Sequence, residues 1–231
     1  MFQIAHAYIA SEVLHSDDPE TIVGAILPDG GISGLGTYVK AVLGKSPAGV
    51  SGITFSDMHP SLQAMSLQQR MDNKSVARGI LTHSVVDIVS HGSDSVSKEN
   101  YNWRHESAYS FGGEDSWWGR RFPKLQVNSH SLGMLLHNFA EVELDAYVAQ
   151  TYPETVELLL NAVQSVSVRE IGKDLARAIG KNPQAIISNV EAYLRATSRF
   201  ARIVEKMPRV NDAGLELVLR ACIQKCKEKV S

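Results

Sequence analysis

Several ingredients that mark particular protein classes are scarce or absent in this sequence of 231 residues. It contains only two cysteines, so no disulfide framework is expected. No apolar run approaches the roughly 20 residues that a membrane-spanning helix needs. A formal net charge of −2 gives no electrostatic argument for binding nucleic acid or an acidic membrane surface. The N-terminal stretch has no basic segment or cleavage site of a signal peptide, so we expect a cytoplasmic protein.

The two cysteines, Cys222 and Cys226, stand four residues apart near the C-terminus. This spacing could contribute to a metal site, but a reduced pair of thiols on a C-terminal helix is the simpler interpretation. Hydrophobic residues make up 44% and charged residues 21% of the chain, which is ordinary for a globular protein.

Helical periodicity dominates the chain, and no convincing alternation of β-branched residues is present, so the predicted class is an all-α multi-helix bundle. A first helix shows an apolar face that runs from Ile4 to Leu14, and Asp18 with Pro19 predicts the start of a second. Further helices are predicted near 38–43, 62–71, 74–91 and 129–151, and four more from 153 to 230, with breaks near Ser167, at Gly180 through Pro183 and at Pro208 through Asn211.

Two clusters of metal-type ligands are spaced as on helices. The first is His83-x3-Asp87-x3-His91, and the second is His137-x3-Glu141. Four residues advance an α-helix by about 40° and about 6 Å, so the side chains within each cluster point the same way. Because an unpaired buried polar group is costly, these clusters on apolar stretches predict a site for divalent metal.

The spacing of the first cluster predicts more than one ion. His83 and His91 lie about 12 Å apart along the helix axis, which suits a single tetrahedral zinc poorly. Asp87 lies between them and could bridge two ions, which are about 3.5–4 Å apart in two-metal hydrolytic sites. The pair of His137 and Glu141 would then serve the ion held by His91.

Isolated residues of the N-terminal part are further candidate ligands: His6, Asp29 and His59. Asp29 follows a proline and His59 precedes one, so the backbone is locally fixed at both. Asp145 continues the helix face of Glu141. For a single buried histidine, an ordinary hydrogen-bonded place in the core is the alternative.

The distribution of residues predicts two parts. All eight histidines and all three tryptophans lie in the first ~150 residues. We therefore predict a metal-binding core over residues 1–151 and a C-terminal helical extension over residues 152–231 that packs on or beside it. Residues 92–128 form a long aromatic and arginine-rich connection, which would suit a lid over a phosphate ester. The alternative is that its aromatic side chains only attach the loop to the helices.

The ordered series of these ligands resembles the bacterial zinc-dependent phospholipase C family, and the single-strand nucleases that share its all-helical trinuclear zinc fold. The series is His6, Pro28-Asp29, His59, His83-x3-Asp87, His91 and His137-x3-Glu141, within roughly residues 1–150. The resemblance implies two to three zinc ions, with other divalent transition metals possible. It assigns one ion to Asp29, His59, His83 and Asp87, a second to His6 and Asp87, and a third to His91, His137 and Glu141.

The resemblance also implies an activity. A metal-bridging water would attack a phosphodiester, with Asp29 and Asp87 as the catalytic carboxylates. The substrate would be a small phosphate ester or a phospholipid, because the near-neutral charge and the lack of basic stripes disfavour long nucleic acids. An HD-type phosphohydrolase is disfavoured because the chain has no adjacent His-Asp pair. A non-catalytic binding or structural protein that retains metal on the same scaffold is the alternative.

Overall fold

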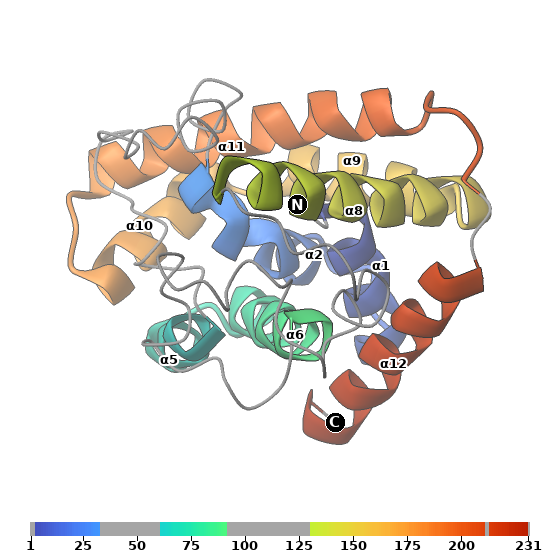
Figure 1. Cartoon of the computed structure of the whole chain (residues 1–231). Coiled ribbons are helices and arrows are strands. Elements are labelled where there is room, and N and C mark those ends of the chain that lie inside the picture. Colours follow the sequence, from blue (N-terminus) through green and yellow to red (C-terminus); the bar gives the residue numbers. More distant parts are fainter. Residues whose placement is uncertain (1–2, 33–60, 92–129, 211–212, 231) are drawn as a thin grey trace.

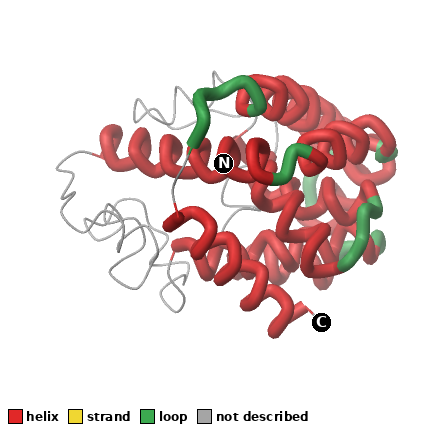
Figure 2. The backbone as a smooth tube through the Cα atoms, turned by 90° about the vertical axis from the view of Figure 1, so that its right-hand side faces the viewer, coloured by secondary structure: helices red, strands yellow, loops and turns green. Residues whose placement is uncertain are grey.

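The computed structural model describes residues 3–32, 61–91, 130–210 and 213–230, and the side chains of residues 3–30, 66–87, 141–210 and 214–230. All regular secondary structure in these ranges is helical, which confirms the predicted class (Figures 1 and 2). The predicted short helix at 38–43 and the connection at 92–128 lie outside the described residues. The elements are α1 (Gln3–Leu14), α2 (Pro19–Ile26), the 3-10 helix η1 (Leu27–Ile32), α5 (Ser61–Arg70), α6 (Lys74–His91), α8 (His130–Thr151), α9 (Glu154–Ser165), α10 (Val168–Ile179), α11 (Pro183–Val204) and α12 (Ala213–Val230).

The first helix, α1, lies in the middle of the bundle rather than on its surface (Figure 1). It contacts α2, α6, α8, α9, α11 and α12. Its buried residues include Ile4, Ala5, Ile9 and Val13 of the predicted apolar face, and also the polar residues Gln3 and His6. Polar side chains on such a helix must find partners inside the protein.

The second helix begins as predicted. Asp18 accepts hydrogen bonds from the Thr21 N–H and hydroxyl, and Pro19 occupies the first turn. The helix ends at Ile26, where the chain tightens into η1, which carries Asp29.

The pairing of α2 with α6 depends on two glycines. A Cβ atom at Gly24 would collide with the Val76 carbonyl, and one at Gly79 would collide with the Thr21 carbonyl. The two backbones therefore lie in direct contact, which only residues without a side chain allow. This close crossing brings the end of α2 against the middle of α6.

The C-terminal helices follow the predicted breaks. Ser167 and Asn182 cap α10 and α11, and Gly180 ends α10 in the left-handed conformation with φ 68°. Helix α11 lies beside α10 and contacts α9, α8 and η1, while α12 packs on α6 and α1. Cys222 and Cys226 of α12 are both buried and form no disulfide.

The N-terminal and C-terminal parts share one cluster of buried apolar side chains, which runs from Ile4 to Cys226. They are also joined at the surface, where Asp174 of α10 accepts hydrogen bonds from the N–H groups of Asp72 and Asn73 between α5 and α6. The division at residue 151 stays a prediction. None of the helices in the described part of the chain has the length and apolar character needed to cross a bilayer.

Candidate metal centre

The helix α6 has the bounds that the sequence predicts and carries His83 and Asp87 one turn apart. Both side chains are buried, with 0% and 2% of each residue exposed. The His83 Nε2 atom lies 3.3 Å from Asp87 Oδ2. A histidine and a carboxylate thus face each other inside the bundle, as their four-residue spacing requires.

The central helix α1 adds a third donor to this pair. His6 is also buried, and its Nε2 atom lies 3.6 Å from the other carboxylate oxygen of Asp87, Oδ1. The rings of His6 and His83 are stacked, with centroids 4.0 Å apart and planes inclined by 21°. His6, His83 and Asp87 therefore offer ligand atoms that all lie within 4.8 Å of one another.

The turn after α2 brings a second carboxylate to the same place. Asp29 of η1 is buried, and its Oδ1 atom lies 3.9 Å from His83 Nε2. His83 Nε2 is therefore approached by one carboxylate from its own helix and by one from the end of α2.

The two distances from the Asp87 carboxylate to the histidine nitrogens match those of atoms that share a metal ion. Zinc bonds of about 2.0–2.2 Å in a tetrahedron place neighbouring donors about 3.3–3.6 Å apart. The contacts of Asp87 with His83 and with His6 are 3.3 Å and 3.6 Å long. Hydrogen bonds between imidazolium and carboxylate are shorter, at about 2.7–2.9 Å. The imidazole and carboxylate set thus fits a divalent cation of the zinc type in both chemistry and spacing.

The other ring nitrogen of His83 is held by the backbone. Its Nδ1 atom lies 2.8 Å from the carbonyl oxygen of Ala25, in the last turn of α2. A carbonyl can only accept, so Nδ1 carries the proton and Nε2 faces the carboxylates. Metal-binding histidines commonly have this arrangement, because a carbonyl or carboxylate partner fixes both the tautomer and the ring.

The pKa values of the two buried histidines are shifted in opposite directions. Burial, with a further contribution from the charge on His83, lowers the pKa of His6 to about 3. Burial alone would also lower the pKa of His83, but the carboxylates of Asp87 and Asp29 raise it to about 9. Without a bound cation, His83 thus holds the positive charge between the two acids. A divalent ion would replace that proton at the same position.

The remaining predicted ligands are placed only in part. Glu141 is buried on α8, the predicted second helix. His91 ends α6 and His137 lies on α8, but their side chains are outside the described residues, as is all of His59. The predicted third ion, and the share of His59 in the first, therefore stay predictions.

Asp145, one turn beyond Glu141, has a structural position that the sequence did not indicate. Its Oδ1 atom accepts hydrogen bonds from the N–H groups of Ile4 and Ala5, at 3.1 Å and 2.9 Å. The carboxylate thus caps the start of α1, immediately before His6. Burial raises the pKa of Asp145 to about 8.

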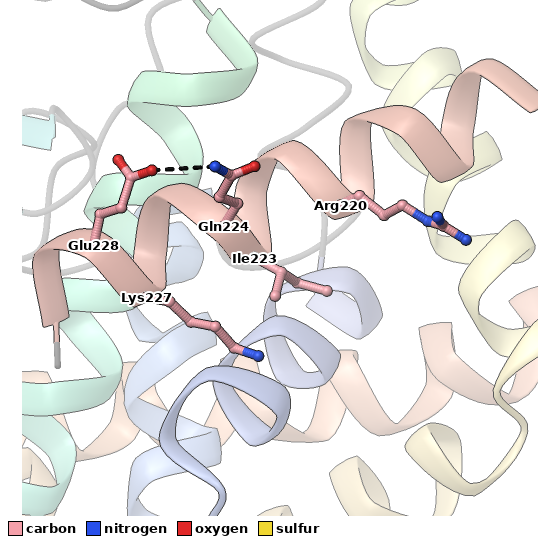
Figure 3. A pocket seen from close by; sticks show the side chains of 5 residues that line it. All are labelled: Arg220, Ile223, Gln224, Lys227 and Glu228. Atoms are coloured by element: carbon pink, nitrogen blue, oxygen red, sulfur yellow. Dashed lines mark hydrogen bonds between the residues drawn. The ribbon is translucent and has the colours of Figure 1, made fainter.

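A shallow depression on the outer face of α12 is separate from this centre (Figure 3). It is lined by Arg220, Ile223, Gln224, Lys227 and Glu228. All five residues come from one helix, and none belongs to the group of His6, His83 and Asp87. In the described part of the chain, the buried group alone has the chemistry of a metal site.

Comparisons of the chain with models of protein families, with curated proteins and with solved structures find no match. The function must therefore follow from the residues of the site itself.

Proposed function

We propose that this protein is a metal-dependent hydrolase of phosphate esters, with Zn²⁺ as the preferred ion. The observation that carries the proposal is that His6, His83 and Asp87 form one buried group with the spacing of shared ligands. These residues come from two helices, α1 and α6, that are far apart in the sequence. The order of these residues along the chain, with Asp29 between them, is also that of the phospholipase C-like pattern in the sequence.

The residues of the chain would divide the work as follows. His6, His83 and Asp87 would hold the ion, and the Ala25 carbonyl would keep His83 in the tautomer that presents Nε2. Asp29, which approaches the same Nε2 atom, would take part in binding and accept the proton of the attacking water. When bound, the cation would act as a Lewis acid toward a phosphoryl oxygen and allow water to react near neutral pH.

The test is a comparison of purified wild-type protein with Asp87→Asn. The wild-type protein, stripped with a chelator and titrated with zinc, is expected to bind zinc and to hydrolyse bis(p-nitrophenyl) phosphate. In Asp87→Asn, the lost charge should weaken zinc binding by more than the roughly 10–100-fold that changes around metal ligands cost, and should abolish hydrolysis. Circular dichroism checks that the helices are retained.

Asp72→Asn is the matched control. It replaces the same kind of residue at an exposed position, where the Asp72 side chain is 80% accessible and pairs with Arg177. It should leave zinc affinity and hydrolysis unchanged. A wild-type protein that binds no zinc, manganese or iron would refute the proposal.

A second candidate function is supported by the burial of the group. His6, His83 and Asp87 are at most 2% exposed, and closed sites with only protein ligands are typical of structural zinc. The protein would then be a helical binding or structural protein that uses metal for stability. In that case zinc would raise the melting temperature of the wild-type protein, increasingly as the zinc concentration rises, with no hydrolysis of any phosphate ester.

A further inference from the structure

Tyr193 of α11 lies under the turn that carries Asp29. Its side chain is fully buried, and it comes from the C-terminal part, far from the ligands in the sequence. Its ring also lies beneath Gly30, since a Cβ atom built there would be 3.4 Å from Tyr193 Cδ1. The residue that follows Asp29 thus rests on this ring.

The hydroxyl of Tyr193 forms hydrogen bonds with two other helices, α2 and α1. It donates a hydrogen bond of 2.7 Å to the carbonyl oxygen of Ile26, the last residue of α2. It also accepts one of 3.3 Å from Gln3 Nε2 of α1. The carbonyls of the last helical turn lack regular partners within the helix, and the Tyr193 hydroxyl supplies a donor to one of them, that of Ile26.

Two adjacent carbonyls at the end of α2 therefore receive donors from different helices. Ala25 takes the Nδ1–H of His83 from α6, and Ile26 takes the hydroxyl of Tyr193 from α11. Burial, with a contribution from the charge of Asp29, raises the pKa of Tyr193 well above its usual range, so the hydroxyl stays a neutral donor.

We propose that Tyr193 is a positioning residue of the metal centre: its bond to Ile26 fixes the end of α2, and this sets both the Ala25 carbonyl that orients His83 and the turn that presents Asp29. The C-terminal helices would then be part of the site, beyond a role as scaffold. This inference rests on the proposed metal centre. A tyrosine that only filled the core would need its ring and not its hydroxyl.

The test compares Tyr193→Phe, which removes one oxygen atom, with Tyr147→Phe. Tyr147 is a matched control, because its hydroxyl donates an equally short bond, 2.8 Å, to Glu216 of α12. Zinc affinity is measured by competition with a chromophoric chelator, and the geometry of the site is measured by the visible absorption of cobalt(II) bound in place of zinc. Tyr193→Phe should bind zinc roughly 10-fold more weakly and shift the cobalt spectrum, because partners that hold a ligand in place are worth 10–100-fold. Tyr147→Phe should change neither.

The outcomes separate this inference from the proposed function. A wild-type protein that binds zinc, with the same affinity and cobalt spectrum in Tyr193→Phe, would overturn the role of Tyr193 and leave the metal centre in place. A wild-type protein that binds no metal would overturn both. If Tyr193→Phe did not fold, Gln3→Met would remove the hydrogen bond that the same hydroxyl accepts from α1. This variant should also weaken zinc binding and shift the spectrum, and an unchanged affinity and spectrum would overturn the role of Tyr193.

Discussion

The helix pairs α2–α6 and α10–α11 pack in the same way but bury different kinds of side chain. Each pair packs closely through glycine: Gly24 and Gly79 in the first, Gly172 in the second. In α10, the buried residues are Ile171, Gly172, Leu175, Ala176 and Ala178, and the charged residues face outward. In α6, by contrast, His83 and Asp87 lie on the buried side.

The same contrast holds for the two parts of the chain. Among the described residues, every buried aspartate, glutamate and histidine precedes residue 152: His6, Asp29, His83, Asp87, Glu141 and Asp145. The buried polar residues after it are the neutral Thr155, Asn189 and Thr197. Close helix packing is thus used in both parts, but only the first uses it to enclose charge, which stability alone would disfavour. Buried charge that costs stability is a sign of function.

Of the substitutions that test this contrast, replacement of Gly79 should have the largest effect on the free energy of unfolding. In Gly79→Ala, the new methyl group meets backbone atoms of Thr21, Gly24 and Ala25, which cannot move aside. We expect a loss of about 3 kcal/mol in the free energy of unfolding, measured with urea, because overpacking usually costs 1–3 kcal/mol and sometimes more. Zinc affinity should fall as well, since the separation of α2 from α6 would break the bond between Ala25 and His83.

Gly172→Ala is the control for that substitution. Its Cβ atom would lie 2.7 Å from Ile187 Cγ1 and 2.9 Å from the backbone atom Ile187 Cα, so this substitution also forces two helices apart. The cost should be about 1–3 kcal/mol, reduced by the helix propensity that alanine regains, and zinc affinity should not change. Equal losses of zinc affinity in the two variants would show that general destabilisation, rather than the α2–α6 contact, controls the site.

Asp145→Asn tests a buried ionisable group of the first part. Because burial raises the pKa of Asp145 to about 8, the folded state binds a proton that the unfolded state releases near pH 4. The contribution of this group to stability is therefore present below about pH 4 and is lost as the pH rises toward 8. In metal-free protein, the stability of the wild type relative to Asp145→Asn should fall over this range, as measured by urea unfolding at several pH values. A difference that does not vary with pH would contradict the burial argument.

Asp174→Asn should show a smaller effect with the opposite sign. Burial would raise the pKa of Asp174, but hydrogen bonds from the Asn73 N–H, Arg177 and the Asp72 N–H lower it. This carboxylate therefore stabilises the fold above its unfolded pKa near 4, and its contribution is lost as the pH falls through the lower folded value. At pH 7 the variant should lose roughly 1–2 kcal/mol in urea unfolding, and near pH 3 the difference should shrink. Zinc affinity should stay the same, since none of the ligands contacts Asp174.

The part of the site that sequence could predict is the part that lies on one helix. The bounds of α6 and the shared direction of His83 and Asp87 follow from the helical repeat, which depends only on neighbouring residues. The cap at Asp18 and the left-handed end at Gly180 are local in the same sense. The resemblance to a zinc enzyme named His6 and Asp29 as partners, but no local pattern could show their approach.

The apolar face predicted for α1 is largely buried, at Ile4, Ala5, Ile9 and Val13, but the burial of Gln3 on the same helix follows from no local pattern. It depends on where the other helices pack against the first turns of α1. The same packing gave Asp145 its position at the start of α1, and it placed Tyr193 against the end of α2 and the turn that carries Asp29. In the sequence, Tyr193 is one aromatic residue on an amphipathic helix, and nothing distinguishes it from a core residue.

The sequence by itself therefore determined the described helices and the candidate ligand pair of α6, His83 and Asp87, because backbone hydrogen bonding and side-chain direction repeat over a few residues. The tertiary structure alone decided which distant residues join that pair. The backbones of α2 and α6 are in direct contact at Gly24 and Gly79. The packing of α1 inside the bundle places His6 beside Asp87. These contacts link positions far apart in the chain, and only packing of the whole bundle can set the few ångströms that make them a site.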